Sequence, residues 1–253
     1  MPKSESIQVL SRALHILDVL SRQDSPRTLA EIAAKAGLPK STTHRLLQAL
    51  AADEFVSVHS LGRYAVGRAM ICVGSRSLRG GLLTQADADA KQLRDLTDHT
   101  VYLTVLHRLE VVYIGKYPGA LMPKTDLGTG PAPFSAPGRA MLSQMPWAEV
   151  EDLIKAHGLT PKTPYSNNDL ARLRAELEET RARGYAFSVN EYAVGVSSLG
   201  APIFDYTGKC TAGLGLSVVL PGDDVDVHGY APLLLETAAR ISERMGHVAA
   251  RAE

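Results

Sequence analysis

Residues 37–50, "GLPKSTTHRLLQAL", set hydroxyl, imidazole and cationic side chains directly before an apolar row. An arginine in this place can bridge O6 and N7 of guanine, and serine or threonine hydroxyls can meet bases or phosphates. A helix start also favours a phosphate, because its first amides point outward unpaired. The pattern predicts a helix that contacts duplex DNA, and a capped, solvated helix is the alternative. The candidate contacts are Lys40, Ser41, Thr42, Thr43, His44 and Arg45.

Two further helices are predicted before this stretch, and together they would hold it in place. The first is amphipathic, because apolar residues recur at spacings of three and four at Ile7, Leu10, Leu14, Leu17 and Leu20. The second begins at Thr28, with Glu31 placed to complete a capping box. Gly37 is suited to end that helix in a left-handed conformation, and Pro39 and Ser41 start the third.

A short hairpin is predicted after the third helix, in "EFVSVHSLGRYAVG" (54–67), with its turn at 60–62. Three helices and a small hairpin are typical of a winged helix-turn-helix. Arg63 lies at the hairpin tip, where a wing would touch the DNA backbone or minor groove. Arg12, Arg27 and Thr28 are placed to add phosphate contacts.

Charge is distributed unevenly along the 253 residues, although the net charge is zero. Residues 1–80 carry 11 lysines and arginines against 6 acidic residues, a net charge of +5, and residues 81–253 carry 16 against 21, a net charge of −5. A basic first part indicates that this part alone meets a polyanion. Uneven surface charge without a partner is the plainer alternative.

Several functional classes lack support in the sequence. Cys72 and Cys210 stand in neither a metal-ligand nor a redox spacing, and the histidines are scattered, so we expect no metal site and no cofactor. No nucleophile elbow, zinc-protease, P-loop or Cys-x-x-Cys motif is present, so we expect a protein that is not an enzyme. Without a signal-like or membrane-length apolar stretch, we expect a cytoplasmic chain with no membrane contact.

The rest of the chain predicts an α+β domain, because helical and strand-like segments alternate with hairpins rather than with crossover helices. We expect a winged helix-turn-helix at 1–68, a linker helix with a break at 69–84, and an effector-binding and oligomerisation domain at 85–253. The segments "TVYLTVL" and "VVYIGKY" predict a hairpin around "HRLE". "NNDLARLRAELEETRARG" predicts a helix that ends at Gly184.

One predicted strand of that domain, residues 211–220, has only small residues on one of its faces. Leu214, Leu216 and Val218 point to one side, while Gly213, Gly215 and Ser217 point to the other. Such a face either admits another backbone closely or leaves room for a ligand. The loop "PAPFSAPGRA" leads into a helix near Gly138, where its amides and Ser135 could hold a carboxylate.

The segments "SRALHILDVL", "TLAEIAAKAGLPKSTTHRLLQAL" and "GRYAVG" resemble the N-terminal domain of the IclR family of bacterial transcription regulators. "VYLTVLHRLEVVYIGKY", "APGRAML", "RARGYAFSVNEYAVGVSSLGAPIFD" and "AGLGLSV" resemble that family's effector-binding domain, in order. The resemblance implies a winged helix-turn-helix, a linker helix and a GAF-like α/β sensor domain, assembled as a homodimer or a dimer of dimers. It also implies a double-stranded DNA operator and a small organic acid effector as partners.

The resemblance also locates the effector site by motif. The positions carried over are Ser135, Ala136, Asn190, Ser197, Ser198 and Ser217, and Phe134, Gly138, Tyr192 and Gly215 join them as candidates. The chain departs from the family at Ala132, Pro133, Ser188 and Ser198, which points away from the glyoxylate- or pyruvate-type ligands of some relatives. Aromatic and thioether side chains at Phe134, Met122, Tyr102 and Tyr192 could instead enclose an aromatic acid, or pack in the core.

We therefore expect a ligand-responsive transcriptional regulator. Repression is the more frequent outcome in the family, and activation of an operon for an aromatic or carboxylic acid is the alternative. Two alternative functions remain. One is an enzyme whose catalytic residues are distant in the sequence and come together only in the folded protein, and the other is a structural DNA-binding protein that needs no pocket.

Overall fold

A computed structural model describes residues 3–23, 25–78, 81–120, 128–219 and 227–248 of the chain. The chain divides into two compact units, residues 1–79 and 80–253, and each is described by itself. The first unit is referred to as the head and the second as the C-terminal domain. The described parts show the α+β class predicted, with helices and antiparallel sheet in both units.

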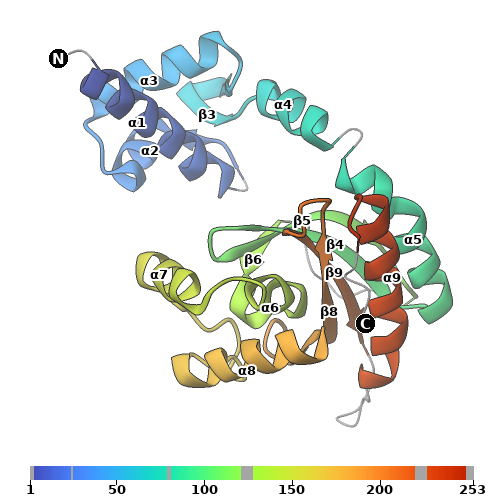
Figure 1. Cartoon of the computed structure of the whole chain (residues 1–253). Coiled ribbons are helices and arrows are strands. Elements are labelled where there is room, and N and C mark those ends of the chain that lie inside the picture. Colours follow the sequence, from blue (N-terminus) through green and yellow to red (C-terminus); the bar gives the residue numbers. More distant parts are fainter. Residues whose placement is uncertain (1–2, 24, 79–80, 121–127, 220–226, 249–253) are drawn as a thin grey trace. The chain divides into compact units, whose positions relative to one another are not determined.

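The head contains a bundle of helices and a small antiparallel sheet (Figure 1). Within its described residues the strand order is β1-β3-β2, and β2 and β3 form the predicted hairpin. The elements are α1 (Lys3–Ser21), β1 (Arg27–Thr28), α2 (Leu29–Ala36), α3 (Lys40–Ala52), β2 (Val56–His59), η1 (Ser60–Gly62), β3 (Arg63–Val66) and α4 (Arg68–Leu78).

The turn between α2 and α3 forms as its residues predict. Thr28 caps α2 in a complete capping box, in which its backbone amide donates to Glu31 and its hydroxyl accepts from the Glu31 amide. Gly37 ends the helix at φ 62°, a left-handed conformation that a side chain would strain. The core beneath the helices is apolar and includes Ile16, Leu20, Ile32, Leu47, Val56 and Tyr64.

The structure buries only part of the apolar row predicted on α1. Leu17 and Leu20 are buried in the head, together with Ile16 and Val19. The other members of the row, Ile7, Leu10 and Leu14, are 67%, 59% and 56% exposed. The first half of α1 therefore carries an apolar stripe that no described residue of the chain covers.

Helix α4 follows the hairpin within the segment predicted as a linker. It begins at Arg68, whose guanidinium is bonded to the carboxylate of Glu54. Its outer surface is also apolar, with Ile71 and Val73 exposed. The next helix starts at Leu82, after two residues outside the described part.

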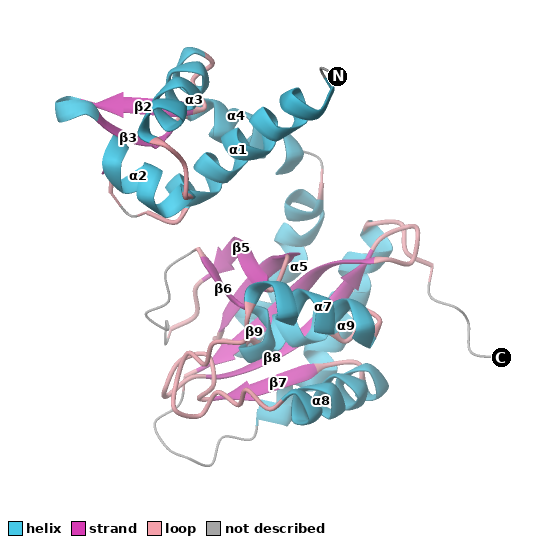
Figure 2. Cartoon of the chain, turned by 90° about the vertical axis from the view of Figure 1, so that its left-hand side faces the viewer, coloured by secondary structure: helices cyan, strands magenta, loops and turns pink. Residues whose placement is uncertain are grey.

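The C-terminal domain is a curved antiparallel sheet with helices on both faces (Figure 2). Among the described residues the sheet has six strands in the order β6-β5-β4-β9-β8-β7. Helices α5 and α9 cover one face, and α6, α7 and α8 lie on the other (Figure 1). The elements are α5 (Leu82–Thr97), β4 (Thr100–His107), β5 (Glu110–Tyr117), β6 (Thr129–Pro131), η2 (Ala132–Phe134), α6 (Ala136–Leu142), α7 (Trp147–His157), α8 (Leu170–Arg183), β7 (Ala186–Val189), β8 (Ser197–Phe204), β9 (Cys210–Val218), η3 (Val227–Tyr230) and α9 (Ala231–Arg244).

Each face of this sheet has its own core. Between the sheet and α5 and α9, the apolar side of β9 packs as predicted, with Leu214 and Leu216 fully buried. On the opposite face a second cluster joins the sheet to α6, α7 and α8 through Val111, Leu142 and Leu177. The domain is thus a central sheet between two helical layers.

The face of β9 that carries only small residues allows the backbone of α6 to approach the sheet closely along part of its length. A Cβ at Gly213 would lie 2.8 Å from the Pro137 carbonyl oxygen, and one at Gly200 on the neighbouring β8 would lie 2.3 Å from the backbone of Ala136. Helix α6 therefore rests almost directly on these two strands. Gly215 and Ser217 lie farther along β9, where the contact opens into a cavity.

Sequence periodicity did not indicate β1, β6 or α7, which are short or lack a clear apolar pattern. Among the described residues, no helix is long and apolar enough to cross a membrane.

Candidate functional site

The solvent face of α3 carries most of the predicted DNA contacts. Lys40, Ser41, His44 and Arg45 are exposed, and Thr42 is half-buried. Since residues three and four apart share one helix face, Ser41, His44 and Arg45 form a continuous row. Gln48 extends this row by one turn, with its side-chain nitrogen 3.5 Å from the His44 ring.

Thr43 is a correction to the predicted contacts. Its side chain is fully buried, and its hydroxyl donates a hydrogen bond to the Pro39 carbonyl at 3.0 Å. It lies on the core side of α3 and cannot reach a base edge from there. Sequence reasoning also missed Gln48, although its position four residues after His44 was a readable signal.

The other predicted contacts lie outside α3. The Arg63 guanidinium donates to the Pro26 carbonyl at 3.1 Å and so ties the hairpin to β1. Thr28 is engaged in the capping box, and Arg27 approaches Glu31 at 3.5 Å. Arg12 is half-buried on α1. Three of these residues are thus engaged in bonds within the head.

A small cavity lies in the C-terminal domain where the start of α6 meets the sheet. It is lined by Tyr102, Tyr113, Ser135, Pro137, Tyr192, Val196, Ser198, Gly215, Leu216 and Ser217. Its volume is about 20 Å³, which is roughly the space that one water molecule requires. None of the described residues that line it carries a formal charge.

Six of the candidate effector residues line this cavity: Tyr102, Ser135, Tyr192, Ser198, Gly215 and Ser217. Met122 lies outside the described residues. The others lie elsewhere. Phe134 and Ala136 are packed in the core, and Gly138 lies against the Ala132 carbonyl. Ser197 is half-buried, and Asn190 adopts a left-handed backbone in the adjoining loop.

The carboxylate-binding helix start predicted near Gly138 is already satisfied within the chain. Ser135 caps α6, and its hydroxyl oxygen accepts the Gly138 amide at 3.1 Å while the hydroxyl donates to Ala132. Pro137 has no amide hydrogen to offer. A ligand carboxylate would therefore have to displace the Ser135 cap.

Three tyrosine rings form the largest part of the cavity wall. Tyr102 and Tyr113 meet edge to face at 5.2 Å between centroids, and Tyr113 meets Tyr192 at 6.2 Å. Burial raises the pKa of Tyr113 far above its usual range, and the neighbouring Tyr192 and Tyr102 add to that shift. The Tyr113 phenol is therefore neutral at physiological pH, and a hydrogen bond with the Tyr192 side chain contributes to its raised pKa.

Four wall residues were absent from the predicted site: Tyr113, Pro137, Val196 and Leu216. Tyr113 and Pro137 lie in segments that the sequence analysis had singled out as a hairpin strand and a loop. No local pattern distinguishes a wall residue from a core residue in either segment, because the cavity exists only once the strands and α6 have packed together.

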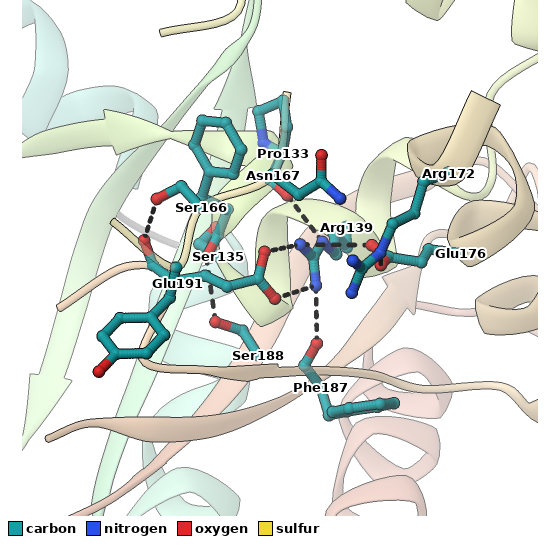
Figure 3. Close-up of polar contacts among 12 residues, drawn as sticks. Pro133, Ser135, Arg139, Ser166, Asn167, Arg172, Glu176, Phe187, Ser188 and Glu191 are labelled. Carbon is teal, nitrogen blue, oxygen red and sulfur yellow. Dashed lines mark hydrogen bonds and ion pairs between the residues drawn. The ribbon is translucent and has the colours of Figure 1, made fainter. Parts of the chain in front are cut away.

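Beside the cavity, a buried arginine joins four elements (Figure 3). The Arg139 side chain is 5% exposed and makes a two-pronged ion pair with Glu191. Its guanidinium also donates to the carbonyls of Pro133 at 2.7 Å and Phe187 at 3.0 Å. Glu176 of α8 lies 3.4 Å from it. Because Glu191 directly precedes Tyr192, this cluster fixes the loop that carries one wall of the cavity.

The described residues include no group of histidine, cysteine and acidic side chains able to hold a metal ion. Burial raises the pKa of Cys210 to about 11, so its thiol is protonated and a poor nucleophile at neutral pH. The candidate site is thus an exposed polar and basic helix face in one unit and an uncharged aromatic cavity in the other.

Comparison with known proteins identifies the family to which these two units belong. Residues 9–59 match the IclR helix-turn-helix domain, and residues 79–243 match the bacterial transcriptional regulator IclR C-terminal domain. The chain belongs to the IclR family. It is 32% identical over 211 residues to the transcriptional repressor IclR of Escherichia coli K12, covering 81% of this chain and 77% of that protein.

Solved IclR structures share the fold over almost the whole chain. An IclR transcriptional regulator from Alicyclobacillus acidocaldarius superposes with a TM-score of 0.79 at 29% identity, over 94% of this chain and 99% of that one. An IclR homologue from Microbacterium hydrocarbonoxydans, solved with 4-hydroxybenzoate, gives a TM-score of 0.76 at 20% identity, over 94% and 98%. Proteins similar to this chain are named transcriptional regulators and repressors, not enzymes.

Proposed function

We propose that this IclR-family protein is a homodimeric repressor that binds its operator through α3 and responds to a small organic acid in the C-terminal cavity. The exposed row on α3 carries the proposal. Family membership makes the chain a DNA-binding regulator, and the direction of control follows the curated relatives, which include the IclR and AllR repressors.

The α3 row supports base reading as well as phosphate contact. Arg45 offers a planar fork suited to guanine, and Gln48 offers an amide suited to adenine. Lys40 and Ser41, at the start of the helix, are placed for the phosphate backbone. The helix start adds its own unpaired amides on that side.

The cavity supports a small effector with an aromatic ring. Its wall includes three tyrosines and the serines at 198 and 217, a largely apolar surface with a few hydroxyls. Aromatic rings prefer to meet in an offset-stacked or edge-to-face geometry, so the three tyrosines favour a ligand that contains an aromatic ring. The 4-hydroxybenzoate in the Microbacterium homologue is an aromatic acid of this kind, although that likeness establishes the fold alone.

The homodimer is supported by the apolar stripe on α1. Ile7, Leu10 and Leu14 fall on one side of the helix and are more than half exposed. Three such side chains in a row are a typical helix-pairing surface, and a second copy of the chain supplies a matching stripe by symmetry. Two heads joined in this way would place two copies of α3 in successive major grooves.

The proposal is tested by measuring DNA binding with and without organic acids. Duplexes selected from a random library are titrated by fluorescence anisotropy at fixed salt, with benzoate, 4-hydroxybenzoate, pyruvate or glyoxylate added separately. We expect one class of acid to weaken binding about tenfold or more and also to raise the melting temperature. If no acid changes the DNA affinity, the proposed ligand response is wrong, and an increase in affinity would indicate activation by a different coupling.

A further inference from the structure

The loop that carries Tyr192 has a fixed backbone. Thr163 donates to the Asn190 carbonyl at 2.8 Å, and Ser166 donates to the Glu191 carbonyl at 2.6 Å. The side chain of Asn190 accepts the Gly195 amide at 2.7 Å across the loop. Together with the Arg139 ion pair, these bonds hold the loop backbone in place. Figure 3 shows the contacts of Glu191 with Ser166 and Arg139.

The Tyr192 ring projects from this fixed loop and closes the cavity. Its edge meets Tyr113, and its hydroxyl lies against β6, where a Cβ at Gly130 would fall 2.0 Å from that oxygen. The glycine at this position is therefore required by the ring. With the backbone held, rotation of the Tyr192 side chain is the simplest movement that enlarges the cavity.

Enlargement is necessary for any ligand of useful size. The cavity volume of about 20 Å³ accommodates roughly one water molecule and no six-membered ring. An aromatic ligand must therefore take the place of a wall ring. Tyr102 is only 4% exposed, and the Tyr113 ring contacts another aromatic ring on each of two sides. Tyr192 is half-buried, so its ring is the one that can move out of the wall.

A lysine lies over the ring that must leave. The Lys162 ammonium is 3.6 Å from the Tyr192 ring centroid, a close cation–π contact. Within the described residues this ammonium meets no carboxylate. A buried carboxylate without a counter-charge is strongly unfavourable, and the described cavity wall offers none. Lys162 is exposed, and once Tyr192 rotates away its ammonium loses the ring that it now contacts.

We propose that Tyr192 and Lys162 together determine effector specificity: the aromatic ring of an acid replaces the Tyr192 ring, and its carboxylate pairs with Lys162. This inference rests on the proposed function, since it names the ligand class and two residues of the same cavity. The proposal does not involve the start of α6, where the Ser135 hydroxyl accepts the Gly138 amide.

The test is calorimetric titration of the full-length chain with benzoate and with benzamide, its neutral counterpart. Tyr192→Ala removes the ring that must be displaced, so we expect benzoate to bind about tenfold tighter or better than to the wild type. Tyr206→Ala, at a tyrosine that is 79% exposed in the turn between β8 and β9, serves as the matched control and should leave benzoate affinity unchanged.

The charge is tested in the Tyr192→Ala background. Lys162→Met should abolish the preference for benzoate over benzamide, and Lys162→Arg should restore most of it. Lys155→Met on α7 is the control, because Lys155 pairs with Glu151 on the protein surface. No gain in Tyr192→Ala would overturn the role of the ring, and a benzoate preference that survives Lys162→Met would overturn the role of the lysine. These titrations contain no DNA, so a missing DNA response would count against the proposed function and not against this inference.

Discussion

The two units of this protein build their functional surfaces in opposite ways. In the head, the side chains that we propose as DNA contacts come mainly from a single helix and are exposed within nine residues, from Lys40 to Gln48. In the C-terminal domain, the cavity is assembled from β4, β5, α6, β8, β9 and the loop before β8, over a span from Tyr102 to Ser217. The head presents a convex, charged face, and the C-terminal domain encloses a concave, uncharged one.

This difference has a physical consequence for mutations. Side chains on the α3 face have few neighbours, so their replacement should alter DNA binding and leave folding intact. Residues around the cavity also hold the domain together, so their replacement should alter stability first. The following experiments sharpen or break that contrast, in order of decreasing expected effect.

The largest effect is expected at Arg139. Replacing it by methionine leaves Glu191 without its counter-charge in a largely buried position, which we expect to cost about 3 kcal/mol of unfolding free energy. Urea unfolding followed by fluorescence measures this, because Trp147 is the only tryptophan in the sequence and lies in the C-terminal domain. Lys91→Met on α5 is the control, since Lys91 pairs with Asp87 on the protein surface and away from the Arg139 cluster. Equal stability of the two variants would show that the cluster does not support the domain.

The next effect is expected at Gly200, where α6 rests on the sheet. Alanine there would place a Cβ 2.3 Å from the Ala136 backbone, and we expect a loss of about 2 kcal/mol. Gly74→Ala in α4 is the counterpart in the head, because that glycine has open space around it. Alanine in a helix should be neutral or stabilise by about 0.5–1 kcal/mol. Circular dichroism in urea compares the two, and an unchanged Gly200→Ala midpoint would contradict the close contact.

Thr43 tests the contrast within the head itself. Thr43→Val removes a buried hydroxyl that donates to Pro39, so we expect a loss of about 1 kcal/mol in stability. Base preference, measured by repeating the selection from random duplexes, should remain that of the wild type. A changed preference at one base position would instead place Thr43 in the groove.

The smallest effect is expected at the capping box of α2. The Thr28 backbone amide, followed by the Thr28 hydroxyl, lowers the pKa of Glu31. A lowered pKa means that the carboxylate stabilises the folded head at neutral pH and that this stabilisation is lost as the pH falls through the folded-state pKa. Glu31→Gln should therefore exchange amide hydrogens faster than the wild type over residues 27–37 near neutral pH, with the difference shrinking in acid. A pH-independent difference would show that the charge does not contribute.

The head could be predicted closely from the sequence because its signals are local. The capping box at Thr28, the left-handed glycine at Gly37 and the hairpin turn at 60–62 each depend on residues a few positions apart. Two errors arose where local patterns do not decide which side of a helix is covered. Thr43 has the polarity of its exposed neighbours, yet faces the core, and Leu14 has the apolarity of its buried neighbours, yet faces solvent.

The cavity could be predicted only in part, because its shape depends on how α6 packs on the sheet. The small residues of β9 indicated an unusual face, and the structure uses that face for both alternatives, close packing at Gly213 and cavity at Ser217. Family resemblance supplied Ser135 and Ser198. The Ser135 cap is local and could have been read from a serine that precedes Pro137 at a helix start. Nothing in the sequence could show that Lys162 lies over Tyr192, because that contact joins two separate segments.

The central claim is that the exposed face of α3 reads base sequence, and Arg45 tests it most directly. Fluorescence anisotropy compares a selected duplex with a scrambled duplex of equal length and composition, at one salt concentration. We expect the wild type to prefer the selected duplex by about 10³-fold or more. Arg45→Ala should lose about 1–3 kcal/mol on the selected duplex and much less on the scrambled one, and Arg45→Lys should recover little, because lysine lacks the planar fork. An equal loss on both duplexes would show that Arg45 contacts only phosphate and would contradict the claim.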